Sequence, residues 1–166
     1  MAELMRYARL VDVILVRHAA AVDETLELHD PFRHLTPEGR EQAKHLGDRL
    51  RWHDCEPRRL WTSPLVRAVQ TAELVAAGLG IAAQIEVMPA LAPGESPRAV
   101  VAALGKLAAD EHVMMFGHEP GMSAIAALLV GAEDFPALAK AEAVRISGDQ
   151  LRWRFAWDAE APAKVP

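Results

Sequence analysis

The feature of this sequence that most constrains its fold is the alternation of short apolar runs with helical segments. Four largely apolar runs have the length of buried strands and lie at residues 11–16, 59–62, 85–88 and 113–116. A segment with apolar residues at helical spacing comes after each of them. Such an alternation is typical of an α/β domain with a largely parallel sheet. A further pair of segments, residues 142–147 and 151–157, flanks a turn and predicts a β-hairpin.

The predicted architecture is a single three-layer α/β/α domain with a mostly parallel central sheet and a C-terminal β-hairpin. We expect it to cover residues 1–158, because the 166-residue chain has the length of one domain, and we expect residues 159–166 to be a disordered tail. Three helix starts are predicted by a hydroxyl residue that can act as a cap followed by a proline, at residues 36–37, 63–64 and 96–97.

Composition excludes several classes of partner. The formal net charge is −5 and no basic face is evident, which argues against nucleic acid as a partner. No apolar run approaches the roughly 18 residues of a membrane span, and the start of the chain does not resemble a signal peptide. The single cysteine, Cys55, excludes an internal disulfide. We therefore expect a cytoplasmic protein without a membrane partner; the oligomeric state is left open.

Reactive side chains follow the four predicted strands. Arg17 and His18 follow the first, Arg67 lies shortly after the second, Glu95 follows the third and His118 the fourth. In parallel sheets ligands bind beyond the carboxyl ends of the strands, so these residues should converge on one edge. Two arginines and two histidines in one pocket favour an anion, and phosphate in particular, because a guanidinium matches phosphate oxygens with two parallel hydrogen bonds.

The residue types also predict roles. Arg67 falls in the first turn of its predicted helix, where backbone N–H groups and the helix dipole add to an anion site. A histidine such as His18 can attack phosphorus if an acceptor fixes its other ring nitrogen. His118 can donate to the phosphoryl oxygens as charge builds during transfer.

Four segments resemble the histidine phosphatase superfamily. Residues 15–19 (Leu-Val-Arg-His-Ala) resemble its Arg-His-Gly signature, residues 63–72 its second motif and residues 117–120 its third. Residues 35–43 resemble its Leu-Thr-x-x-Gly-x-x-Gln-Ala segment. The resemblance implies a phosphoglycerate mutase-like fold and a reaction that needs no metal or other cofactor.

The resemblance also implies a role for each matched residue. His18 would be the nucleophile, Arg17 and Arg67 phosphate ligands, and His118 a second phosphate-contacting histidine that stabilises the transition state. Ala19 stands where the family has glycine, and alanine would be strained there if the position required a positive φ. The carbonyl of Ala19, which could orient the His18 ring, is unaffected by the change.

Within the superfamily the chain is most similar in outline to SixA-type phosphohistidine phosphatases, which are short and lack the long insertion of phosphoglycerate mutases. Residues 30–36 resemble their Asp-x-x-Arg-Pro-Leu-Thr segment, with His34 in place of proline. Arg33 is therefore a candidate for an additional phosphate ligand, with a plain surface role as the alternative.

The predicted function is hydrolysis of phosphohistidine, or a similarly activated phosphoryl group, through a phosphohistidine intermediate on His18. The substrate would be a phosphorylated protein or a small phosphorylated compound. Imidazole leaves without strong acid help, whereas an alkyl phosphate needs a proton donor, for which Glu95 is the first candidate and Asp23 the second. Two alternatives stay open: a broad phosphomonoesterase with Glu95 as general acid, and a non-catalytic phosphate-binding module.

Overall fold

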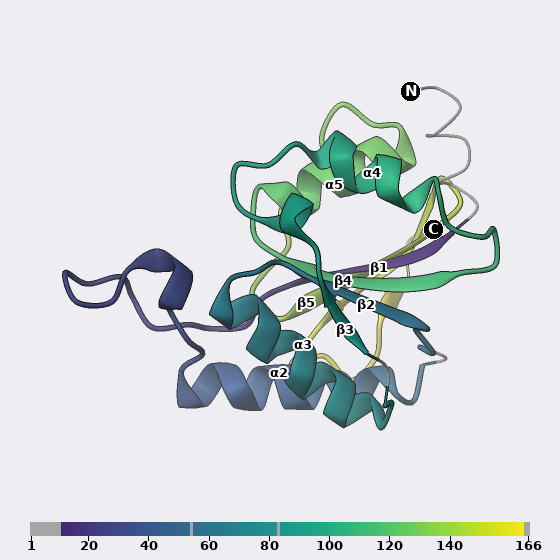
Figure 1. The fold of residues 1–166 in the computed structure, drawn as a ribbon. Coiled ribbons are helices and arrows are strands. Elements are labelled where there is room, and N and C mark those ends of the chain that lie inside the picture. Colours follow the sequence, from purple (N-terminus) through teal and green to yellow (C-terminus); the bar gives the residue numbers. More distant parts are fainter. Residues whose placement is uncertain (1–10, 54, 83, 165–166) are drawn as a thin grey trace.

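The computed structural model describes residues 11–53, 55–82 and 84–164 (Figure 1). Within them, seven strands form one sheet in the order β3-β2-β4-β1-β5-β6-β7. The strands are β1 (Asp12–Arg17), β2 (Arg59–Thr62), β3 (Ile85–Val87), β4 (His112–Gly117), β5 (Glu142–Ser147), β6 (Gln150–Ala156) and β7 (Ala163–Lys164). The neighbouring strands β3, β2, β4 and β1 are parallel, whereas β5, β6 and β7 continue the sheet in antiparallel fashion.

Helices cover both faces of this sheet (Figure 1). One layer consists of α2 (Pro37–Leu50) and α3 (Val66–Leu79), and the other of α4 (Pro97–Leu104) and α5 (Gly121–Val130). Two short 3₁₀ helices, η1 (Asp30–Phe32) and η2 (Pro89–Leu91), lie in the connections. None of the described helices is long and apolar enough to cross a bilayer.

The alternation of side chains along β1 shows why both faces of the sheet must be covered by helices. Val13 and Leu15 belong to the core on the side of α4 and α5, and Ile14 and Val16 to the core on the side of α2 and α3. Successive residues of a strand point to opposite faces, so a strand that is apolar throughout must be buried on both. The predicted three-layer fold is confirmed.

Two glycines let α2 and α3 pack closely beneath the sheet. A Cβ atom on Gly47 would lie 2.4 Å from the carbonyl oxygen of Val75, and one on Gly78 would lie 2.7 Å from the amide nitrogen of Asp48. Side chains at either position would force the helix backbones apart. The close packing holds α3, whose first turn carries Arg67, against the rest of the domain.

Some predicted boundaries are wrong in detail. The helix predicted to start at Ser63-Pro64 begins at Val66, with Leu65 as its N-cap, and α4 ends at Leu104 rather than near residue 109. The predicted tail at 159–166 is corrected in part: β7 pairs with β6 through the Lys164–Trp153 and Ala163–Arg154 registers. Residues 1–10 of the predicted domain and 165–166 of the tail lie outside the described residues.

Candidate active site

The strand register places the two predicted site histidines side by side. In the parallel pair β1–β4, Arg17 lies opposite Gly117, so the next residues, His18 and His118, leave the same sheet edge together. Their ring centroids are 5.1 Å apart, and both side chains are buried. The predicted convergence of these residues on one edge therefore holds for the ends of β1 and β4.

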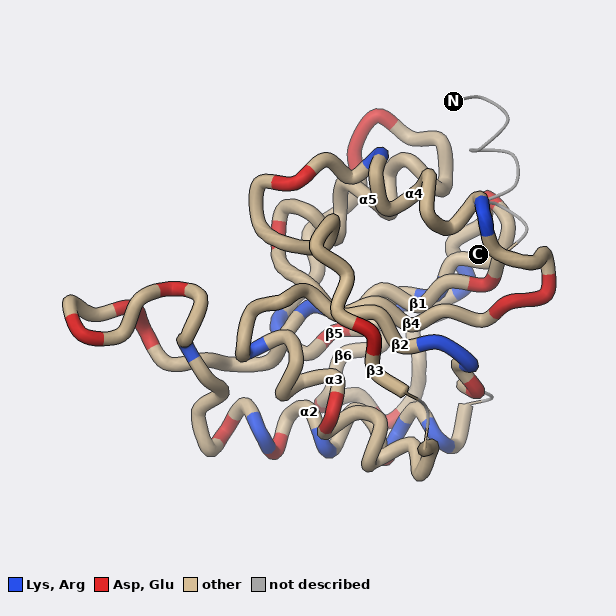
Figure 2. The backbone as a smooth tube through the Cα atoms, in the orientation of Figure 1, with Lys and Arg blue, Asp and Glu red and all other residues tan. Residues whose placement is uncertain are grey.

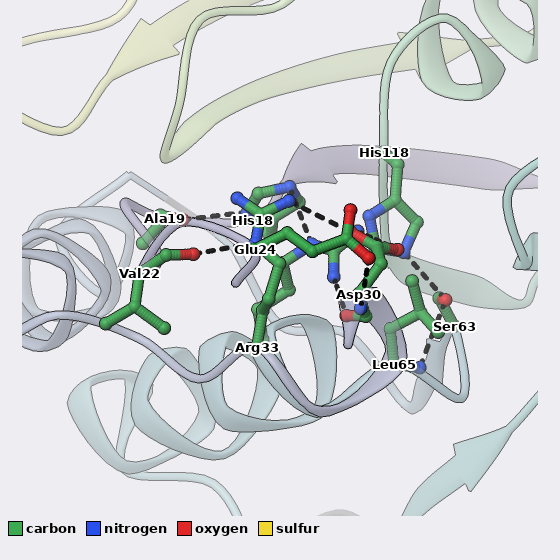
Figure 3. A network of polar contacts seen from close by, with 10 residues as sticks. His18, Ala19, Val22, Glu24, Asp30, Arg33, Ser63, Leu65 and His118 are labelled. Carbon is green, nitrogen blue, oxygen red and sulfur yellow. Dashed lines mark hydrogen bonds and ion pairs between the residues drawn. The ribbon is translucent and has the colours of Figure 1, made fainter. Parts of the chain in front are cut away.

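The His18 ring is oriented by the chain itself (Figure 3). Its Nδ1 lies 2.8 Å from the carbonyl oxygen of Ala19, so the Nδ1–H donates there and the lone pair of the neutral ring is on Nε2. Arg67 Nε donates to this Nε2 atom at 3.3 Å. An unprotonated Nε2 beside a guanidinium is the arrangement that a nucleophile toward phosphorus requires.

Ala19 takes its place without backbone strain. Among the described residues, Ala141 is the only non-glycine residue with a positive φ, so the condition under which alanine would be strained at position 19 is not met. The Ala19 N–H donates to Thr71 Oγ1 at 3.1 Å, which ties this turn to α3. The alanine therefore preserves the contact that orients His18.

Arg67 lies at the centre of the polar network and is almost fully buried. Its NH1 donates to the backbone oxygen of Asp30 at 2.8 Å, and its NH2 lies 3.2 Å from Asp30 Oδ2. The Asp30 carboxylate also accepts from Arg33 NH1 at 2.9 Å. Partial burial works to raise the pKa of Asp30, but the hydrogen bonds from Arg33 and Arg67 outweigh it and the pKa is lowered. Asp30 is thus a carboxylate held between Arg33 and Arg67.

Asp30 belongs to a projecting segment, residues 22–34, which we call the arm. The arm extends away from the sheet, and acidic positions gather on it (Figures 1 and 2). Arg33 Nε donates to the backbone oxygen of Val22 at 2.6 Å and so joins the two ends of the arm. Together with the Asp30–Arg67 contacts, this bond fixes the base of the arm against α3.

Arg17 is held by a second group of residues, around Leu138 and Glu119. Its NH1 donates to the carbonyl oxygen of Leu138 at 2.7 Å, and the Leu138 N–H donates to Glu119 Oε1 at 2.9 Å. The other oxygen of Glu119 accepts from Ser123 Oγ at 2.6 Å. Arg17 Nε is buried and has no hydrogen-bond partner among the described residues. A buried donor without a partner costs about 1–3 kcal/mol, and an oxygen of a bound anion would satisfy it.

His118 is fixed by a hydroxyl that follows β2. Its Nε2 lies 2.7 Å from Ser63 Oγ, whereas its Nδ1 is buried without a partner among the described residues. Ser63 was predicted only as a helix cap; in the structure its Oγ bonds to His118 and accepts from the Leu65 N–H at 3.4 Å. One nitrogen of His118 is thus positioned by the protein and the other is left for a ligand.

Both histidines are kept neutral at physiological pH. Burial lowers the pKa of His18 to about 4, opposed by the hydrogen bond with Ala19 and assisted by the positive charges of Arg67, Arg17 and Lys140. Burial likewise lowers the pKa of His118 to about 3, assisted by His18, Arg67 and Arg17 and opposed by Asp30. A doubly negative phosphoryl group would favour the protonated form, so its arrival would raise both values.

These lowered pKa values predict a pH dependence of stability. Between pH 6.5 and about 4 the unfolded chain binds a proton on His18 that the native protein does not, so the free energy of unfolding should fall as the pH falls through this window. The contribution of His18 should be about 3 kcal/mol, since one pKa unit corresponds to 1.36 kcal/mol. Denaturant titrations from pH 7 to pH 4 measure it.

The matched variants for this measurement are His18→Gln and His45→Gln, because His45 lies on the exposed face of α2. The loss of stability on acidification should be shallower in His18→Gln than in the wild-type protein and unchanged in His45→Gln. An equally steep loss in all three proteins would contradict a buried, neutral His18.

The remaining predicted residues lie at the periphery. Glu95 is exposed in the turn after η2 and shares a cavity with His118. Asp23 is exposed on the arm. Arg33 reaches the site through Asp30, and its direct contact with phosphate stays a prediction, as does the acid role of Glu95. No cluster of three or more His, Cys, Asp or Glu side chains suited to a metal ion occurs in the described part of the chain.

Comparisons with known proteins agree with this geometry. The model of the histidine phosphatase superfamily (branch 1) matches residues 13–93. An uncharacterised protein of Picosynechococcus is 32% identical over 114 residues, which are 68% of each chain.

Solved structures share the whole fold. The structure of the protein histidine phosphatase SixA complexed with tungstate has a TM-score of 0.78 and 26% identity, over 88% of this chain and 97% of SixA. Phosphoglycerate mutase from Bacillus anthracis has a TM-score of 0.67 at 13% identity, over 93% and 92% of the two chains. The family predicted from the motifs is thereby confirmed: this chain belongs to the histidine phosphatase superfamily.

Proposed function

We propose that this protein is a phosphatase that hydrolyses phosphohistidine, or a similarly activated phosphoryl group, through a phosphohistidine intermediate on His18. The observation that carries the proposal is the Nδ1 contact of His18 with the Ala19 carbonyl, which leaves the Nε2 lone pair directed at Arg67. A neutral imidazole with its lone pair beside a phosphate-binding group is a nucleophile in position.

The reaction takes place in two displacements. In the first, His18 Nε2 forms a bond to phosphorus as the bond to the leaving group breaks, and the leaving nitrogen takes a proton from water, whereas a leaving oxygen would take one from an acid such as Glu95. In the second, water attacks the phosphorus of the phosphohistidine, inorganic phosphate is released, and His18 is neutral again. In-line transfer of this kind depends mainly on positioning and on charge stabilisation.

The phosphoryl oxygens are held by Arg17, Arg67 and His118. Arg17 Nε and His118 Nδ1 are two of the buried polar atoms that lack a partner in the described structure, and a phosphoryl oxygen offers one to each. Arg67 has one N–H on each terminal nitrogen beyond those bound to Asp30. The hydrogen bonds from these donors become stronger as negative charge builds on the transferring group.

The chemistry of the leaving group favours phosphohistidine as the substrate. Glu95, the first candidate acid, is exposed, so nothing holds it as firmly as the nucleophile is held. Imidazole, with an ordinary pKa near 6.5, leaves without a strong acid, whereas an alkoxide does not. The SixA structure is described as that of a protein histidine phosphatase, which agrees with this assignment. The substrate is then a phosphohistidine protein or a small activated phosphate in the cytoplasm.

A broad phosphomonoesterase is the second candidate, because Glu95 and His118 line the same cavity. The non-catalytic alternative rested on Ala19 in place of glycine, and the contact of the Ala19 carbonyl with His18 Nδ1 supports the catalytic proposal instead.

Glu95→Gln separates the two activities. We expect it to lower phosphate release from phenyl phosphate by roughly 10²-fold, the scale of a lost general acid, and to leave dephosphorylation of a phosphohistidine protein within about twofold of wild type. Steady-state phosphate release on both substrates measures the effect, with Glu41→Gln on the exposed face of α2 as the control. Equal losses on the two substrates would contradict the phosphohistidine assignment.

A further inference from the structure

A cavity of about 190 Å³ opens beside the phosphoryl-binding residues, on the side of β3. It is lined by the turn that follows η2 and by the start of α5, including Ala92, Pro93, Glu95, His118, Ala124 and Ile125. By the same measure a single water needs only about 10–15 Å³, so the cavity has room for a ring. Of these lining residues, only His118 also holds the phosphoryl group in the proposed mechanism.

The sheet order determines which part of a substrate would occupy this cavity. His18 follows β1 and His118 follows β4, while the turn that contributes Glu95 comes after β3 on the far side of β2. A group leaving in line with His18 Nε2 departs on the side of phosphorus opposite that atom. Because β4 lies between β1 and the β3 side of the sheet, a group that leaves past His118 would reach the cavity between η2 and α5.

The charged side chains that line the cavity are all acidic. Apart from His118, the ionisable lining side chains in the described structure are Glu95 and Glu119, and no lysine or arginine lines the cavity. The carboxylate of Glu119 accepts hydrogen bonds from Leu138 N and Ser123 Oγ, and Glu95 is exposed at the rim. An anionic leaving group would find no cation there and would meet two carboxylates.

The lining also offers little to a polyhydroxylated leaving group. Most of its side chains are alanine, proline, leucine, methionine and isoleucine, which cannot pair with hydroxyl groups. Polar groups left unpaired on burial are strongly disfavoured, whereas an apolar ring gains from leaving water.

We infer that this cavity is a leaving-group site selective for flat, uncharged or cationic rings, and that it rejects leaving groups that carry a carboxylate or a second phosphate. The inference rests on the proposed function, since it assigns the substrate class of the same site. It favours the imidazole of a phosphohistidine, and aryl phosphates as its synthetic counterparts, over phosphoglycerate-like substrates.

The test is binding of two non-hydrolysable ligands that differ by one para-carboxylate, benzylphosphonate and 4-carboxybenzylphosphonate, measured by calorimetry at pH 7.5. We expect the wild-type protein to bind the uncharged ring at least about tenfold more tightly. Ala124→Lys and Ala92→Lys, which place a cation in opposite walls of the cavity, should each reduce this preference or invert it. Ala99→Lys, on the exposed face of α4 outside the cavity, should leave it unchanged.

Equal dissociation constants for the two ligands in the wild-type protein would overturn the inference. So would a preference that neither cavity variant changes, or the absence of binding of both ligands. Two different cavity variants guard against one that fails to fold. Because no turnover is needed, this result is independent of whether His18 becomes phosphorylated, so a failure of the leaving-group site is distinguishable from a failure of the phosphatase reaction.

Discussion

Replacing His18 by alanine should lower kcat for phosphate release by roughly 10⁴-fold or more, the scale on which removal of a nucleophile acts in other enzymes. The side chain that carries the lone pair is lost, and His118 does not replace it, because its Nε2 is bound to Ser63 Oγ and its Nδ1 donates to a phosphoryl oxygen in the proposed mechanism. Phosphate release on a phosphohistidine protein and on phenyl phosphate should fall together, since both substrates use the same first step.

The control for this variant is His45→Ala, at an exposed position of α2 where the side chain contacts Arg49 and Trp157 and none of the site residues labelled in Figure 3. Its turnover should stay within about twofold of wild type, the ordinary range for a neutral surface change. Thermal unfolding of both variants at pH 7.5 shows whether each is folded. A folded His18→Ala protein with more than about one tenth of wild-type kcat would be incompatible with the assigned nucleophile.

Replacing Arg67 by lysine should lower kcat/KM by about 10²–10³-fold, although the charge is conserved. The guanidinium contacts His18 Nε2 and two separate oxygens of Asp30 at once, and an ammonium group cannot reproduce this planar set of donors. Because these contacts strengthen as charge develops on the transferring group, most of the loss should appear in kcat rather than in KM.

Arg152→Lys is the matched control, since Arg152 is exposed on β6 and the same chemical change there should have no effect on kcat/KM. Steady-state kinetics on both proteins gives the comparison. An Arg67→Lys protein with wild-type kcat would contradict this account. It would show that Arg67 acts only as a point charge and that the planar arrangement of its donors does not contribute to catalysis.

Much of the fold could be predicted from local patterns. The four parallel strands were placed within a residue or two, because a strand buried on both faces leaves an unbroken apolar run such as that of β1. The boundaries of α3 and β7 were missed for a different reason. Leu65 rather than Ser63 precedes the first turn of α3, and β7 is a two-residue strand that exists only through its pairing with β6.

The site could be predicted where a motif falls directly at a strand end. His18 and His118 belong to this class, since adjacent parallel strands carry them to the same edge. Asp30 and Glu119 do not, because their roles depend on contacts across 37 and 19 residues, with Arg67 and Leu138. The only sequence signals for them were an Asp-x-x-Arg segment and the residue after His118.

Ser63 illustrates a third case. It was recognised as a polar residue before a proline, which indicates a cap, but its hydroxyl is directed to His118, 55 residues away. A short-range pattern cannot distinguish these two uses of a hydroxyl group. The structure thereby adds Ser63 to the candidate site as the residue that positions His118.

The most direct test of the central claim is a single-turnover trap of the phosphoenzyme. Wild-type and His18→Ala proteins are mixed with a phosphoryl donor labelled on phosphorus, quenched in alkali and digested, and the labelled peptide is identified. The proposed mechanism predicts a base-stable, acid-labile label on the wild-type peptide that contains His18 and no label on the variant. Label and turnover that persist in His18→Ala would contradict it.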